Sequence, residues 1–85
     1  MPKSIFSGAH ANLVEVLKAA RKSAGVTQAE LGRRIGKDQT YVSIIETAQR
    51  RVDVVEFCAI SIALGQAPTA RFMSFVESLP EDFDI

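Results

Sequence analysis

The sequence is short of the features that mark exported, membrane-bound or disulfide-stabilised proteins. Cys58 is its only cysteine, so no internal disulfide can form. No apolar run approaches the ~20 residues that a membrane-spanning helix needs, and the opening MPKSIFSGAHANL lacks the apolar centre of a secretory signal. These absences predict a cytoplasmic protein that contacts no membrane, in which Cys58 is a small core residue.

Residues that could form a chemical site are also scarce. His10 is the only histidine, whereas a metal site needs several ligands brought together. Serine and aspartate are present, but nothing in their spacing suggests that they converge with His10. A chain of 85 residues in helices also leaves little room for a substrate pocket. We therefore expect no enzyme, no cofactor and no metal site.

Proline is confined to Pro2, Pro68 and Pro80, so most of the chain can form helices without interruption. Apolar residues recur at helical spacing, and no stretch alternates as a strand does. The pattern predicts an all-α protein with five helices: residues 10–24, residues 28–35, residues 39–47, a fourth between Asp53 and Gly65, and a fifth beginning at Pro68. We expect one domain over residues 1–85, with its core at about 10–65.

The second and third helices carry clear signals at their ends. Thr27 with Glu30 forms a capping box for the second helix, and Asp38 can cap the third. Gly36 allows a left-handed turn between them, and Gly32, without a side chain, lets the two helices cross closely. Helices this short are marginal alone. We expect four inward-facing side chains to hold them together: Leu31, Ile35, Val42 and Ile45.

The last two helices are the most apolar part of the chain. Asp53 with Glu56 forms another capping box, and the helix that follows is apolar nearly all round, so we expect it to be the most buried helix. The fifth helix has a stripe suited to the core or to a contact between subunits: Phe72, Phe75, Val76 and Leu79. Residues 66–85, which include an acidic tail, are the expected dimerisation element.

The formal net charge is zero, but the charges are distributed unevenly along the chain. Residues 17–52 carry eight basic and three acidic side chains, a net charge of +5, whereas residues 53–85 carry one basic and six acidic ones, a net charge of −5. A basic middle region suits a nucleic-acid partner. The plainer alternative is two solvated faces of opposite sign.

Two short helices joined by a tight glycine turn fit a helix-turn-helix, whose second helix enters the DNA major groove. At RKSAGVTQAELGRRIG, YVSIIE and DVVEFCAISIALG, the chain resembles the phage-repressor-like (Cro/repressor, xenobiotic-response-element type) helix-turn-helix regulators, over residues 13–64. The resemblance implies a compact, lambda-repressor-like DNA-binding domain of four or five helices, of prokaryotic or phage origin. It also implies a homodimer on a palindromic operator in double-stranded DNA.

The resemblance carries over to single positions. The side chains expected to read bases are Gln39, Thr40, Ser43 and Ile44. Those expected at phosphates are Gln28, which matches a phosphate-contacting glutamine of the family, and Lys37, Tyr41, Arg50 and Arg51, which lie in or near the third helix. Arg21 and Glu46 match a buried ion pair that joins the first helix to the third.

The chemistry of these side chains agrees with their expected roles. The amide of Gln39 can bond N6 and N7 of adenine together, Thr40 offers a hydroxyl and a methyl group, and Ile44 can make only apolar contact. Phosphates, in contrast, need fixed donors and cations. The sequence therefore predicts a sequence-specific transcriptional regulator at the nucleoid. The small size and the lack of an effector domain favour a repressor.

A second hypothesis is a protein-interaction adaptor built on the same fold. One form is an antitoxin-like protein whose acidic C-terminal segment wraps a basic partner. The net neutrality of the chain, the apolar Ile44 and the negative charge of Asp38 favour this hypothesis. The two functions are compatible, because one protein can bind both a partner and DNA.

Overall fold

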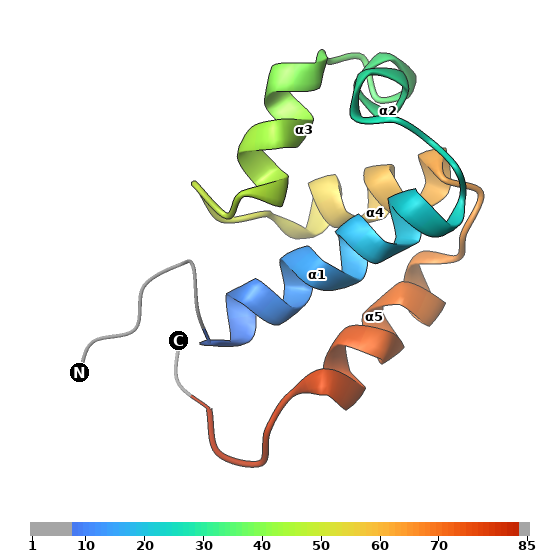
Figure 1. Cartoon of the computed structure of the whole chain (residues 1–85). Coiled ribbons are helices and arrows are strands. Elements are labelled where there is room, and N and C mark those ends of the chain that lie inside the picture. Colours follow the sequence, from blue (N-terminus) through green and yellow to red (C-terminus); the bar gives the residue numbers. More distant parts are fainter. Residues whose placement is uncertain (1–7, 84–85) are drawn as a thin grey trace.

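The computed structural model describes residues 8–83, which form five α-helices and no strand. The helices are α1 (Gly8–Ser23), α2 (Gln28–Arg34), α3 (Gln39–Glu46), α4 (Val54–Ala63) and α5 (Pro68–Ser78). Figure 1 shows α1 crossing the middle of the molecule, with α2 and α3 on one side of it and α5 on the other. The predicted all-α fold is confirmed. No helix in this part of the chain has both the length and the apolar character to cross a membrane.

The core lies where the first four helices meet. Its buried apolar side chains are Leu17, Ala20, Val26, Leu31, Val42, Ile45, Phe57, Ile60 and Leu64. Leu31 of α2 and Ile45 of α3 are each only 1% exposed, and burying a side chain of this kind contributes ~1.5–3 kcal/mol. Packing between α2 and α3 thus holds together two helices that are too short to be stable alone.

The turn between α2 and α3 depends on two glycines. A Cβ atom on Gly32 would come within 2.5 Å of the backbone C and O atoms of Asp38. The same close approach lets the N–H of Lys37 donate to the carbonyl oxygen of Gly32 at 2.7 Å. Gly36 adopts a φ of +74°, in the left-handed region that favours glycine. The predicted close crossing of the two helices is confirmed.

The caps of α3 and α4 are formed as predicted. Asp38 Oδ1 accepts from the N–H of Tyr41 at 3.0 Å and satisfies a donor in the first turn of α3. At α4 both halves of the capping box are present: the N–H of Glu56 donates to Asp53 Oδ1 at 2.7 Å, and the N–H of Asp53 donates to Glu56 Oε1 at 3.0 Å. Glu56 is therefore fixed at the start of α4.

The capping box predicted at α2 is only half formed. Thr27 Oγ1 accepts from the N–H of Glu30 at 3.1 Å. The carboxylate of Glu30, however, accepts from Arg33 and Arg34, at 2.5 and 2.9 Å. The prediction that Glu30 reaches back to the cap was wrong in this half, because two charged donors one turn further on compete for the carboxylate.

The prediction that the fourth helix is the most buried was wrong. Val54, Val55 and Ile62 of α4 are 77%, 76% and 65% exposed. Cys58 is half-buried and does not join the core cluster, contrary to expectation. The helix buries one stripe, centred on Phe57, and α5 covers only part of the rest. An apolar helix is expected to pack its surface against other elements, but the sequence does not show that residues 8–83 contain enough of them to cover it.

Candidate nucleic-acid interface

The outward face of α3 is uncharged and open among the residues that the structure describes. Gln39 and Thr40 are exposed, and Ser43 and Ile44 are half-buried. The helical period places these four on the side opposite the core residues, such as Val42, which is 1% exposed. The four side chains that the sequence predicts as base-reading therefore lie on one accessible face of α3. This helix lies at the edge of the molecule (Figure 1).

A buried ion pair anchors α3 to α1. Arg21 Nε donates to Glu46 Oε2 at 2.6 Å, and Arg21 Nη2 donates to Glu46 Oε1 at 2.9 Å. Arg21 Nη1 donates to the carbonyl oxygen of Val26 at 2.8 Å. Burial disfavours the charged form of Glu46, but hydrogen bonds from Arg21 and Gln28 outweigh it and hold the pKa of Glu46 below its usual value. This is the pair expected from the sequence, and it fixes the orientation of α3.

A line of amides connects this ion pair to the start of α3. Gln28 Nε2 donates to Glu46 Oε1 at 3.0 Å, and Gln28 Oε1 accepts from Gln39 Nε2 at 3.4 Å. Because Glu46 can only accept, this bond sets which end of the Gln28 amide faces Gln39. Gln28, expected at a phosphate, thus also contacts the first of the expected base-reading side chains.

Two of the expected phosphate contacts, Lys37 and Arg50, lie over the aromatic ring of a third, Tyr41. Lys37 Nζ lies 5.3 Å from the centroid of the Tyr41 ring, and Arg50 Cζ lies 4.9 Å from it. At these distances both cations are attracted by the face of the ring. The fifth expected contact, Arg51, is exposed in the loop that follows Arg50.

Glu56 contacts two members of this group, Tyr41 and Arg50, although its place in the sequence predicts only a helix cap. Arg50 Nη1 and Nη2 donate to its Oε1 and Oε2 at 3.0 and 2.6 Å, and the Tyr41 hydroxyl also donates to Oε2. The hydrogen bonds from Arg50 are the largest cause that lowers the pKa of Glu56 to about 2. The bond to Glu56 also raises the pKa of Tyr41. No regular spacing joins residues 41, 50 and 56, so only the fold reveals the cluster.

The two arginines on the outer side of α2 are paired as well. Arg33 and Arg34 both donate to Glu30 and lower its pKa to about 2, with Arg33 the larger cause. Arg34 Nη1 also donates to the carbonyl oxygen of Ala63 at 3.0 Å, which ties α2 to the end of α4. These contacts leave α2 with a structural role in addition to its long-range positive charge.

His10 is buried and has a structural partner. Its Nε2 accepts from the N–H of Val52 at 3.2 Å and joins α1 to the loop before α4. Within residues 8–83, no three His, Cys, Asp or Glu side chains gather as metal ligands would.

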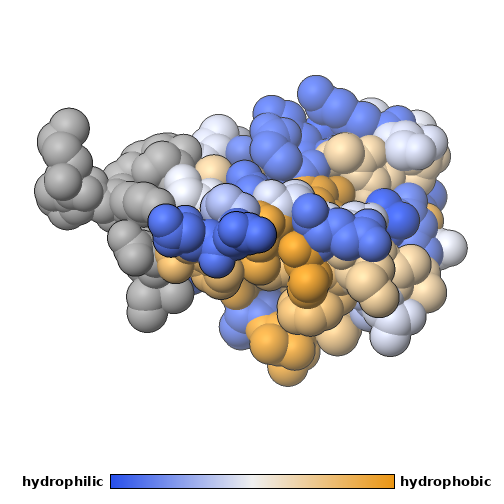
Figure 2. Space-filling model, turned by 90° about the horizontal axis from the view of Figure 1, so that it is seen from below, coloured by the Kyte–Doolittle hydropathy of each residue, from blue (hydrophilic) through white to orange (hydrophobic). Residues whose placement is uncertain are grey.

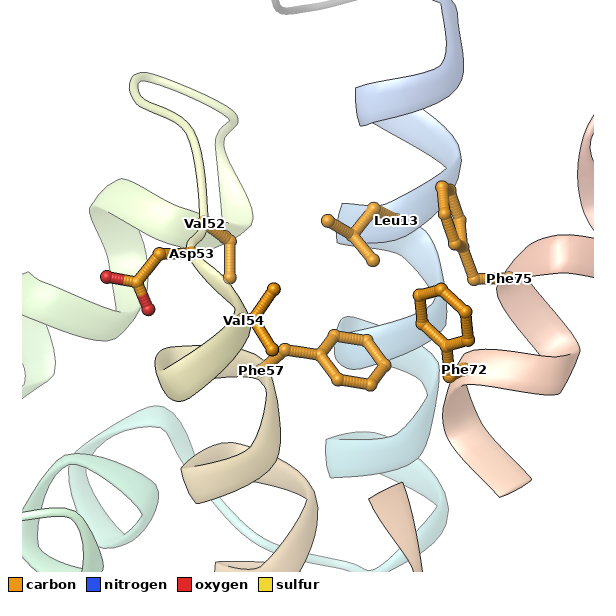
Figure 3. Close-up of a pocket in the computed structure, with 7 residues that line it drawn as sticks. All are labelled: Leu13, Val52, Asp53, Val54, Phe57, Phe72 and Phe75. Carbon is orange, nitrogen blue, oxygen red and sulfur yellow. The ribbon is translucent and has the colours of Figure 1, made fainter. Parts of the chain in front are cut away.

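A second accessible surface, on the side away from α3, is apolar. We call it the α4–α5 groove, and it is lined by Val54, Phe57, Cys58, Pro68, Thr69, Phe72, Met73 and Val76. Two of these lining residues, Phe57 and Phe72, point toward one another near Leu13 of α1, with their ring centroids 6.1 Å apart (Figure 3). Seen from below, hydrophobic side chains gather in a band across this face of the molecule (Figure 2).

Comparison with known proteins agrees with this geometry. The family model described as Helix-turn-helix matches residues 17–70. An XRE-family like protein from Pseudomonas syringae pv. tomato str. DC3000 is 40% identical, with a TM-score of 0.73 over 80% of this chain and 83% of that one. The restriction-modification controller protein C.AhdI from Aeromonas hydrophila is 30% identical, with a TM-score of 0.65 over 72% of this chain and 92% of that one.

A more distant structure, the clp gene regulator ClgR from Corynebacterium glutamicum, shares the fold at 22% identity, with a TM-score of 0.74 over 84% of this chain and 92% of that one. No curated protein matched the chain. The family match covers most of the chain and includes all of α2 and α3, where the helix-turn-helix geometry was found. The chain therefore belongs to the XRE-type family of DNA-binding helix-turn-helix regulators.

Proposed function

We propose that this chain is a sequence-specific transcriptional repressor that reads the DNA major groove with α3 and acts as a homodimer in the cytoplasm. The observation that carries the proposal is the outward face of α3. It is uncharged and accessible, and it lies beside a group of cations and amides suited to phosphates. Base edges are read by hydrogen-bonding and apolar groups, whereas phosphates are bound by charge.

In this proposal Gln39, Thr40, Ser43 and Ile44 contact base edges. The bond from Gln39 Nε2 to Gln28 limits the orientations of the Gln39 amide before DNA arrives. An amide held in this way loses less conformational entropy on binding an adenine. Phosphates on either side are bound by Gln28, Lys37, Tyr41, Arg50 and Arg51.

The α4–α5 groove is the proposed contact between two copies, together with the rest of residues 66–85. Phe72, Met73 and Val76 of α5 are 53%, 57% and 44% exposed. Apolar surface of this kind, joined to the exposed start of α4, is what a homodimer interface buries. Two recognition helices related by a twofold axis would then lie about 34 Å apart and would read the two halves of a palindrome.

Selection of bound duplexes from a random library, at fixed moderate salt, tests the function directly. The expected result is a palindromic consensus with half-sites separated by about one helical turn. Retention of no sequence above background, under conditions where the protein is folded, would contradict the proposal.

The role of Gln39 is tested on the selected duplex and on a random one. Gln39→Ala should weaken the selected duplex by about 1–3 kcal/mol and leave the random duplex nearly unchanged. Gln49→Ala is the matched control, because Gln49 is another exposed glutamine, just beyond α3. Equal losses on both duplexes for Gln39→Ala would show that it does not read bases.

A protein partner bound through the acidic segment is the alternative proposal. Glu77, Glu81 and Asp82 are all exposed after or near the end of α5, and Asp84 lies outside the described residues. Three carboxylates on one short segment would suit a basic partner protein. Salt-sensitive capture of such a partner, without any salt-sensitive affinity for DNA, would favour this alternative.

A further inference from the structure

The phosphate-binding side of the proposed interface is already occupied by an anion of the protein itself. Arg50 uses Nη1 and Nη2 on Glu56, and Nη1 also donates to the carbonyl oxygen of Arg51 at 2.8 Å. The Tyr41 hydroxyl donates to the same carboxylate. The Nη1 and Nη2 groups of Arg50, with which it could grip a phosphate by two parallel bonds, are therefore engaged in the free protein.

We propose that Glu56 is an internal competitor for DNA: its carboxylate holds Arg50 and Tyr41 in the free protein, and a backbone phosphate displaces it from them in the complex. This inference rests on the proposed function. It adds a residue that does not touch a base and yet sets how strongly the protein binds DNA of any sequence.

The geometry gives the competition its direction. A carboxylate and a phosphate oxygen make the same kind of bond to a guanidinium, so one can replace the other without loss of bond type. The Arg50 side chain is 38% exposed, so a phosphate can reach it, while that of Glu56 is 17% exposed and stays attached to the cap of α4. The exchange moves the arginine and leaves the backbone in place.

The consequence is a lower affinity for arbitrary DNA. While Arg50 is neutralised by Glu56, it does not neutralise a DNA phosphate, so the cations condensed on that phosphate are not released. Binding then requires that the internal pair be broken first. A site whose bases match α3 supplies the free energy for this step, whereas a random site does not. Glu56 would thus sharpen discrimination between operator and bulk DNA.

Glu56→Gln tests the proposal and retains the fold, because glutamine also serves at this position of a capping box. We expect Glu56→Gln to bind a random duplex more tightly than the wild type at low salt. The slope of log K against log salt should become steeper by about 0.9, as for one added phosphate contact. The advantage should then shrink by about 3.5-fold between roughly 50 and 200 mM salt.

Two further variants separate competition from simple loss of a negative charge. Glu30→Gln is the matched control, since Glu30 also binds two guanidinium groups and has the same lowered pKa of about 2. It should leave the salt slope unchanged. In a background of Arg50→Gln, Glu56→Gln should give no steeper slope.

The outcomes distinguish this inference from the proposed function. A wild type that binds its operator, with Glu56→Gln unchanged or weaker at an unaltered slope, would overturn the competition and make Glu56 a support for Arg50. A gain of the same size in Glu30→Gln would also overturn it. Failure of both the wild type and Glu56→Gln to bind any duplex would overturn the function and the competition together.

Discussion

The two ends of the molecule differ in where their apolar side chains lie. At the α2–α3 end, apolar side chains such as Leu31 are buried between the two helices, and amides and cations face outward. At the α4–α5 end, apolar side chains such as Met73 stay on the surface, and α5 buries no residue fully. The first end is complete as it stands and suits a polar, charged partner. The second is incomplete and suits another apolar protein surface.

The largest effect on stability is expected at the Arg21–Glu46 ion pair, which anchors the α2–α3 end to α1. Glu46→Ala should lower the free energy of unfolding by about 3–5 kcal/mol, because it leaves the charge of Arg21 buried without its partner. Urea denaturation measures the loss. Replacing both members, as Arg21→Met with Glu46→Leu, should restore most of the stability, since no charge is then left alone. A loss below about 1 kcal/mol for Glu46→Ala would mean that water reaches the pair.

A substitution at the α4–α5 end should change the association of two copies and leave the folding of each copy nearly unchanged. Met73→Glu places a charge in the α4–α5 groove, at a side chain that is 57% exposed. We expect the dimer dissociation constant to rise by about 100-fold or more, equivalent to about 2.7 kcal/mol, with little change in helical content. Analytical ultracentrifugation measures the constant.

Ile62→Glu is the control for this substitution, because Ile62 is 65% exposed on α4 but does not line the groove. It should leave the dissociation constant nearly unaltered. A wild type that is monomeric at high concentration would refute the contrast between the two ends. In that case the groove would be ordinary exposed surface.

A smaller effect is expected at the crossing of α2 and α3. Gly32→Ala gains about 1 kcal/mol of helix propensity, but its Cβ would meet the backbone of Asp38 at 2.5 Å. Overpacking costs about 1–3 kcal/mol, so we expect the free energy of unfolding to fall by about 1 kcal/mol. Thermal unfolding measures this loss. Ala29→Gly, at an exposed position of the same helix, measures the propensity alone. A stabilised Gly32→Ala variant would show that the crossing is looser than described.

The same contrast explains what the sequence could and could not predict. Most signals within one or two turns were reliable: Asp38 and Asp53 cap their helices, and Gly36 takes the left-handed turn. The exception is Glu30, whose carboxylate pairs with two arginines instead of the cap. The spacing of Leu31 and Ile45 identified the packed faces, and the motif placed the outward face of α3. These features depend on neighbours along the chain, which a sequence displays.

Features that depend on what lies across space were missed. The apolar α4 was expected to be buried, but Val54 and Val55 are more than three-quarters exposed, because periodicity does not say which side another element covers. The partner of Arg50 was likewise not foreseen. Glu56 was assigned to its cap, and nothing in the sequence shows that the loop after α3 turns Arg50 back onto it.

The smallest effect concerns acid, and it follows from the pKa of Glu56. The folded protein lowers this pKa from 4.5 to about 2, so between these values the unfolded chain binds the proton more readily. The stabilisation by Glu56 is therefore complete above about pH 4.5 and is lost as the pH falls toward 2.

Glu56→Gln, which cannot ionise, should be less stable than the wild type at pH 7. The gap should stay under about 1 kcal/mol because Arg50 is partly solvated, and in urea titrations it should narrow below pH 4.5 and close only as the pH reaches about 2. A gap that persists in acid would mean that the carboxylate stabilises the fold through its cap and not through its charge.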